Sequence, residues 1–230
     1  MGGKKLKVPV AARKSAMGSV PRAPFATRGF YGLWQRRRNR PELKTIDTTD
    51  TTYASLDSTN GNITFLNGVA TGTDFNTRVG RKILMKSILI RYQWYPLTST
   101  SDSNGDVARI LVVYDSQPNG SATNPVITDF LQTASYLSPN NLNNRTRFKV
   151  LYDKTLTMEA WTMSAGALVN GGPRPRAGTI YKKLSHEAIY NGTGSTVGTI
   201  QEGAIFFVVI PATNATTGLI FNSRIRFTDN

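Results

Sequence analysis

From residue 43 to its end, the chain consists of short runs of β-branched and aromatic residues that are separated by clusters of turn residues. The clearest runs are "RKILMKSILIRYQWYP" (81–96), "AIFFVVIP" (204–211) and "LIFNSRIRFTD" (219–229). About eight such runs with long connections predict an all-β fold, namely a single eight-stranded jelly roll in which two sheets form a sandwich. An immunoglobulin-type Greek key fits less well, because the connections are long and unequal.

Side-chain alternation predicts which face each strand buries. In residues 81–96, one face carries Lys86 as its only charge, beside Leu84, Ile88, Ile90, Tyr92 and Trp94. In residues 219–229, the predicted inward side chains are Leu219, Phe221, Ile225 and Phe227, and the outward ones are Asn222, Arg224, Arg226 and Thr228. The run at 204–211 is apolar on both faces, as a central buried strand should be. One short helix in a loop is predicted within residues 124–137, where Phe130, Leu131, Ala134 and Leu137 recur at helical spacing.

Positive charge is concentrated at one end of the chain. The formal net charge is +14, and residues 1–45 hold twelve Lys and Arg residues against one acid, a net of +11, whereas residues 46–230 add only +3. Residues 1–42 also contain Pro, Gly and Ser without any sustained apolar period. We therefore expect a disordered basic arm over 1–42 and the jelly-roll domain over 43–230. This asymmetry favours a polyanionic partner for the arm.

The cations of the arm are the predicted nucleic-acid-binding residues. Spread along a flexible chain, they can neutralise phosphates in a sequence-tolerant and salt-sensitive way. The predicted binding residues are Lys4, Lys5, Lys7, Arg13, Lys14, Arg22, Arg28, Trp34, Arg36, Arg37, Arg38 and Arg40. Lys44 continues the same run of cations and is counted with them. Trp34 belongs to an aromatic cluster with Phe25, Phe30 and Tyr31, which either packs against the domain or stacks on unpaired bases.

The basic runs also suit a second partner. "GKKLK" and "QRRRNRP" are clusters of Lys and Arg of the kind that nuclear import receptors recognise. A membrane is not an expected partner, because the arm has no amphipathic helical face and the chain has no run of 18 apolar residues.

Residues that could catalyse a reaction or hold a metal are scarce. The chain has no cysteine and one histidine, His186, which excludes a Cys–His pair and a multi-histidine metal site. Asp102, Asn104 and Asp106 alternate like the start of a calcium loop, but valine stands at the sixth and twelfth positions, where an EF-hand needs Gly and Glu. A strand-connecting turn is favoured there. The sequence predicts no enzyme, no cofactor and no metal site.

Four strand motifs resemble those of the coat proteins of geminiviruses and related circular single-stranded DNA viruses. They are "VGRKILMKSILIRYQWY" (79–95), "ARILVVYDSQPNG" (108–120), "NRTRFKVLYDKTLTM" (144–158) and "SRIRFTDN" (223–230). The resemblance spans residues 36–230. The geminivirus coat proteins often carry Cys and His in the arm, and since this chain has no cysteine, metal binding is not implied. The shorter arm is more similar to the wider circular DNA virus group or to the small satellite virus coats.

The resemblance implies a viral capsid protein. About sixty copies would form a small icosahedral shell around a single-stranded DNA genome, with the arm pointing inward, in the virion and, during assembly, in the host nucleus. Cations of the domain would then line the interior or a subunit contact: Arg145, Arg147, Lys149, Arg224 and Arg226. Two alternatives stay open: a satellite-type coat protein that packages single-stranded RNA, and a cellular β-sandwich binding module with a basic tail.

Overall fold

The computed structural model describes residues 41–97, 101–164, 167–168 and 175–229. The chain divides into two units, residues 1–40 and residues 41–230, and only the second is described below. The predicted arm lies outside the described residues, apart from its last two positions. Among the described residues, no helix is both long and apolar enough to cross a membrane.

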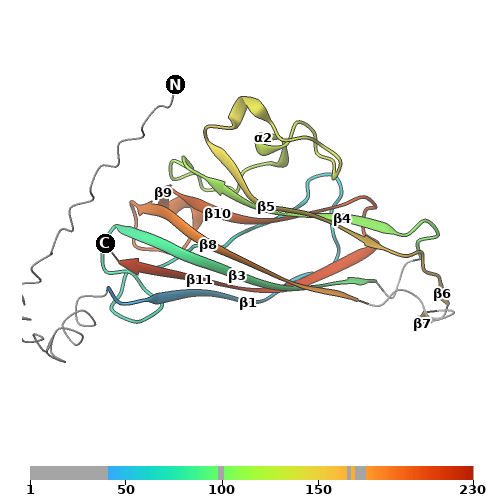
Figure 1. Ribbon diagram of the computed structural model, residues 1–230, viewed down its shortest axis with the longest axis horizontal. Helices are drawn as coiled ribbons and strands as arrows, with labels where there is room; N and C mark the ends of the chain where they lie inside the picture. Colours follow the sequence, from blue (N-terminus) through green and yellow to red (C-terminus); the bar gives the residue numbers. More distant parts are fainter. Residues whose placement is uncertain (1–40, 98–100, 165–166, 169–174, 230) are drawn as a thin grey trace, which may run out of the picture. The chain divides into compact units, whose positions relative to one another are not determined.

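Eight of the strands in the described residues form two four-stranded arrays (Figure 1). One array contains β1 (Lys44–Tyr53), β11 (Thr217–Asp229), β3 (Lys82–Pro96) and β8 (Arg176–Tyr190), and the short β9 (Ile200–Glu202) extends its β8 edge. The other contains β2 (Asn62–Phe65), β10 (Ala204–Pro211), β4 (Asp106–Asp115) and β5 (Phe148–Met158). The smaller elements are β6 (Met163–Ser164), β7 (Ala167–Leu168), helix α2 (Ile127–Phe130) and the 3-10 turns η1 (Leu142–Asn144) and η2 (Val197–Thr199).

The pairing of these eight strands is nested. In chain order the first pairs with the last (β1 with β11), β2 pairs with β10, β3 with β8, and β4 with β5, all antiparallel. A long hairpin rolled up in this way gives the double-sheet jelly roll. The predicted fold class is therefore confirmed.

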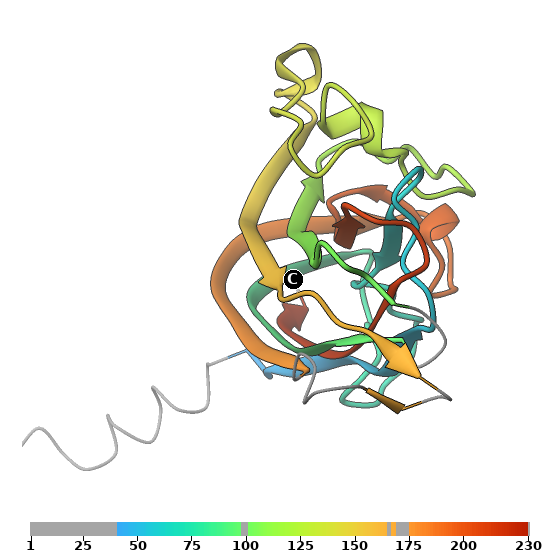
Figure 2. The same cartoon turned by 90° about the vertical axis from the view of Figure 1, so that its right-hand side faces the viewer.

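The core lies between the two sheets, which pack face to face in the view of Figure 2. Every residue of β10 is buried, as predicted for 204–211, because this strand is central in its sheet. Phe207 of β10 meets Phe221 of β11 across the sandwich with ring centroids 4.5 Å apart. The residues of β11 that were predicted to point inward are all buried. Thr228 was predicted to point outward, and this is wrong, because its side chain is buried too.

A β-bulge corrects the predicted face of β3. The pairing of β3 with β8 shifts between Met85 and Ser87, so the alternation changes phase at Lys86. Ile83 and Met85 are buried, Leu84 is only half-buried, and Lys86 is exposed. The predicted inward position of Lys86 and Leu84 is wrong, because the extra residue keeps the ammonium group in water while the apolar face stays continuous.

The predicted helix is much shorter than its periodic pattern. It ends at Phe130, because Leu131 takes an extended conformation and forms a bridge with Asn140. The rest of the connection from β4 to β5 is a folded-back loop, in which Gln132 N donates to Pro139 O at 3.0 Å. Leu137, predicted on the helical face, is exposed in this loop.

Candidate nucleic-acid interface

The outer face of the β1–β11–β3–β8 sheet gathers exposed cations from three strands. The inner face of these strands is apolar, so strand alternation turns the intervening residues outward. Near the middle of this face the exposed cations are Arg224 and Arg226 of β11, Arg91 of β3 and Lys183 of β8. Towards the start of β3, Lys82 and Lys86 are exposed as well, and Lys82 is paired with Glu187 of β8. No helix or loop of the described residues is needed to bring them together, because the sheet itself sets their spacing.

The strand register places these side chains in rows. Arg226 is opposite Ser87, which is opposite Lys183. Arg224 is opposite Leu89, and Asn222 is opposite Arg91. Directly opposite residues of an antiparallel pair lie about 5 Å apart, so successive rows form a compact basic face. We call Arg91, Lys183, Arg224 and Arg226 the basic face.

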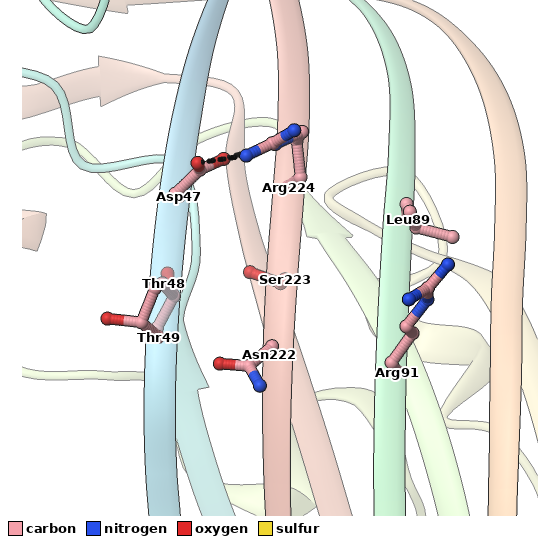
Figure 3. A pocket seen from close by; sticks show the side chains of 8 residues that line it. All are labelled: Asp47, Thr48, Thr49, Leu89, Arg91, Asn222, Ser223 and Arg224. Carbon is pink, nitrogen blue, oxygen red and sulfur yellow. Dashed lines mark hydrogen bonds and ion pairs between the residues drawn. The ribbon is translucent and has the colours of Figure 1, made fainter.

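One carboxylate is built into the basic face. Asp47 of β1 accepts two hydrogen bonds from Arg224, at 2.7 Å from Nε and at 2.6 Å from the terminal nitrogen (Figure 3). This bidentate contact raises the pKa of Arg224 and fixes its guanidinium plane. Asp50 lies at the margin, where its backbone N–H donates to the side chain of Asn222. The four cations of the basic face outnumber these two carboxylates.

A shallow hollow of about 290 Å³ lies on the basic face between the three strands. Figure 3 shows its walls: Asp47 and the two threonines that follow on β1, Asn222 to Arg224 on β11, and Leu89 and Arg91 on β3. Its lining combines polar and charged groups with the apolar side chain of Leu89. Such a surface can hold a phosphate by charge and a sugar or base edge by hydrogen bonds.

One exposed aromatic ring extends the basic face. Tyr181 of β8 is 59% exposed and stands opposite Leu89 in the same row as Arg224. Tyrosine on an open sheet surface can stack on an unpaired base, while nearby cations neutralise the backbone phosphates. The combination fits a single-stranded nucleic acid, whose bases are free to stack.

A family comparison identifies the class of protein. The model of the satellite tobacco necrosis virus coat protein family matches residues 43–230. The chain belongs to this family. It is therefore a viral coat protein, a structural component of the virion that associates with copies of itself. No curated protein matches the chain.

Solved structures resemble this coat protein only distantly. The 60-mer BFDV capsid protein is 9% identical, with a TM-score of 0.31, over 84% of this chain and 94% of the other. A structure of infectious bursal disease virus, Gx strain, is 9% identical, with a TM-score of 0.23, over 83% and 37%. The T=3 Penaeus vannamei nodavirus is 13% identical, with a TM-score of 0.22, over 97% and 64%. Similarities this low have no bearing on function.

The predicted site residues of the arm lie outside the described residues. These are Lys4, Lys5, Lys7, Arg13, Lys14, Arg22, Arg28, Trp34, Arg36, Arg37, Arg38 and Arg40. Lys44, counted with them, is described, and that prediction is wrong. Its side chain is buried, and Nζ lies 2.9 Å from Asp229 and 3.0 Å from the carbonyl of Thr77. Lys44 therefore ties β1 to β11 and to the β2–β3 loop.

The second predicted basic cluster is divided by the fold. Arg147 forms two 2.8 Å hydrogen bonds with Asp115, which is 1% exposed, and its guanidinium lies 4.7 Å from the ring centre of Phe148. It therefore joins β4 to the start of β5. Arg145 is exposed in the connection from β4 to β5, and Lys149 is exposed on β5, in the other sheet from Arg224 and Arg226.

The calcium-like turn has a structural use. Asp106 accepts hydrogen bonds from the backbone N–H of Val107 and Thr213 and from the hydroxyls of Thr216 and Thr217. Burial raises the pKa of Asp106 despite these donors. Its oxygens thus join β4 to the β10–β11 turn. In the described ranges, no three His, Cys, Asp or Glu residues come together in a way that could hold a metal ion.

His186 packs against an aromatic ring. Its ring centroid lies 4.5 Å from that of Tyr114, and burial together with the charge of Lys149 lowers the pKa of His186.

The sequence pointed to Arg224 and Arg226 of the basic face but not to Arg91, Lys183 and Tyr181. Strand alternation could have found Arg91, but only the register shows that these residues share a surface.

Proposed function

We propose that the protein assembles into a closed icosahedral shell of about sixty copies and packages a single-stranded nucleic acid. The proposed contacts are residues 1–42, as a basic arm, and the basic face of the sheet. The observation that carries the proposal is the charge of residues 1–40, which hold eleven Lys and Arg residues and no acid. A chain segment with uncompensated charge of this density needs a polyanion to neutralise it.

The amount of charge suits a packaged genome. Sixty arms with eleven cations each would bring about 660 positive charges, enough for a similar number of phosphates. The basic face would add a weaker and more ordered contact, because its cations are fixed by the sheet and Tyr181 offers a ring for stacking.

Single-stranded DNA is the genome that the strand motifs favour through their resemblance to coat proteins of circular DNA viruses. A satellite-type coat protein that packages single-stranded RNA is the alternative, and the family match suits it equally well. Neither a flexible basic arm nor a tyrosine ring distinguishes the sugar 2′-OH. The basic runs of the arm also suit a nuclear import receptor, which would bring the protein to a host nucleus for assembly.

Packaging can be tested with particles from two full-length triple variants and one truncation. Removal of residues 1–40 should abolish nuclease-protected nucleic acid while the domain stays folded. Replacement of Arg91, Arg224 and Arg226 by Gln should reduce protected nucleic acid and flatten the salt dependence of binding by about 2 units of slope, at ~0.7 per lost phosphate contact.

The matched control replaces three exposed cations on or just before β5, Arg145, Lys149 and Lys154, by Gln, which removes the same charge. This control should package as the unmodified protein does. DNase and RNase digestion of the protected material then separates the two genomes. Full packaging by the truncated protein would refute the role of the arm, and equal losses in both triple variants would refute the role of the basic face.

A further inference from the structure

Large apolar side chains that remain exposed fall mainly into two groups. Within the described residues, seven are exposed: Leu43, Phe75, Val79, Val126, Leu137, Leu142 and Tyr181. Tyr181 lies on the basic face. The first group, Leu43, Phe75 and Val79, flanks the start of β1 and is called the edge group. The second, Val126, Leu137 and Leu142, belongs to the connection from β4 to β5 and is called the connector group.

The edge group stands on a backbone that is firmly held. Arg78 is 1% exposed, and its guanidinium donates to the carbonyls of Val69, Gly80 and Gly192 while stacking 4.3 Å from the ring centre of Tyr190. The neighbouring loop is fixed to two strands of the sheet. Thr45 N donates to Phe75 O at 3.0 Å, and Val79 N donates to Asp229 at 3.3 Å. Phe75 and Val79 are nevertheless 66% and 69% exposed.

A second buried arginine holds the backbone around Leu137 of the connector group in the same manner. Arg109 is 9% exposed and is paired with Asp153 at 2.6 Å. It also donates to the carbonyls of Tyr136 and Ser138, at 3.3 and 2.5 Å. These carbonyls lie on either side of Leu137, which is the most exposed of the seven side chains at 75%. Figure 2 shows this connection, in yellow and green, projecting from the sandwich.

Apolar side chains on a rigid backbone are suited to protein contacts. Little conformational freedom is lost when they dock, and their burial removes apolar surface from water. A coat protein meets copies of itself over much of its surface. Because the two groups differ in residues and lie on different elements, a contact between them is heterologous, and contacts of this type close into rings when the rotation allows it.

We propose that the edge group of one copy packs against the connector group of a neighbouring copy in the shell. The inference rests on the proposed assembly and adds the surfaces that mediate it. Phe75 and Leu137 are its central side chains. The partner that covers each group is thus a second copy of this chain. If a segment of the same chain covered the edge group instead, the test below would detect it.

The absence of cysteine from the chain permits a direct test. In the full-length protein, Phe75→Cys and Leu137→Cys are introduced singly and together, and assembled particles are oxidised. A disulfide needs Cα atoms about 4.4 to 6.8 Å apart, so it reports close approach. The double variant should give disulfide-linked dimers and higher oligomers, and an equal mixture of the two single variants should give dimers. Each single variant alone should remain unlinked.

Serine variants test how much the proposed contact contributes to assembly. Phe75→Ser or Leu137→Ser should reduce particle yield at least tenfold while the circular dichroism and the unfolding transition of the subunit are retained. Lys154→Ser is the control, at an exposed position of β5 that belongs to neither group and lies outside the basic face, and it should assemble normally.

Three results would overturn the inference. Disulfides in either single variant would indicate that like groups meet at a two-fold axis. The other two results are only intramolecular linkage, or none, in the double variant, and normal assembly of both serine variants. Failure of the unmodified protein to form particles would instead refute the proposed shell itself.

Discussion

Replacement of the buried Arg78 by Met should destabilise the domain strongly. In the native protein its guanidinium group is the donor for three carbonyl oxygens, those of Val69, Gly80 and Gly192. Methionine preserves much of the side-chain volume and can still pack on Tyr190, but it offers no hydrogen-bond donor. The change therefore isolates the hydrogen bonds from the packing.

The magnitude follows from two opposing terms. A buried acceptor that loses its donor lowers the free energy of unfolding by about 1 to 3 kcal/mol. For three carbonyl oxygens the loss of stability is therefore about 3 to 9 kcal/mol. Burial of the guanidinium charge is itself unfavourable, as the lowered pKa of Arg78 indicates, and removal of the charge recovers several kcal/mol. We expect a net loss of about 3 kcal/mol, a large part of the stability of a typical domain.

Guanidinium chloride unfolding of dissociated subunits measures this loss. The matched control is Arg91→Met, which removes an exposed guanidinium from β3 and should change the free energy of unfolding by less than about 0.5 kcal/mol. If Arg78→Met also fell within about 0.5 kcal/mol of the unmodified protein, the three carbonyls would have to find other donors. The role of Arg78 in fixing the edge group would then be wrong.

Two further predictions concern pH and backbone strain. Because the pKa of His186 is lowered in the folded protein, its stabilising neutral form is fully present above about pH 6.5 and is lost as the pH falls through the folded-state pKa. The unmodified protein should therefore lose more stability than His186→Asn between pH 7 and 5, and equal losses would contradict this. Gly203→Ala should cost about 3 kcal/mol, because φ is +82° and a Cβ would lie 2.2 Å from the carbonyl oxygen of Glu187. Gly198→Ala, whose added Cβ meets nothing closer than 3.7 Å, is the thermal-unfolding control and should be near neutral.

Strand faces could be predicted from the sequence wherever the alternation is unbroken. The inward residues of β11 and the fully buried β10 follow from period and composition. The bulge in β3 could not be located in this way, because one extra residue changes the phase without changing the composition. Lys86 on an otherwise apolar face was the visible sign of it. A charge predicted inward among Ile and Trp side chains indicates a register error more often than a buried lysine.

The structural cations were beyond sequence reasoning for a different reason. Arg78 and Arg109 are held largely by backbone carbonyls, which leave no side-chain pattern to detect. The carboxylate partner of Arg109, Asp153, lies on another strand and is recognisable only once β4 and β5 are paired. Lys44 was grouped with the arm because it continues the run of positive charge, although strand β1 already begins there.

These cations show why net charge alone does not locate the nucleic-acid contact. The chain has 28 Lys and Arg residues, of which eleven lie in residues 1–40, leaving 17 against 14 acids in residues 41–230, a net of +3. Several of the 17 are engaged by carboxylates or carbonyls: Lys44, Arg78, Arg109, Arg147 and Arg224. Net charge treats them like any other cation, yet three of these five, Lys44, Arg78 and Arg109, are buried, and the hydrogen bonds of all five hold strands and loops together. The binding capacity of the domain therefore depends on which cations the register leaves exposed on one face, whereas residues 1–40 contain no acid that could pair with their charge.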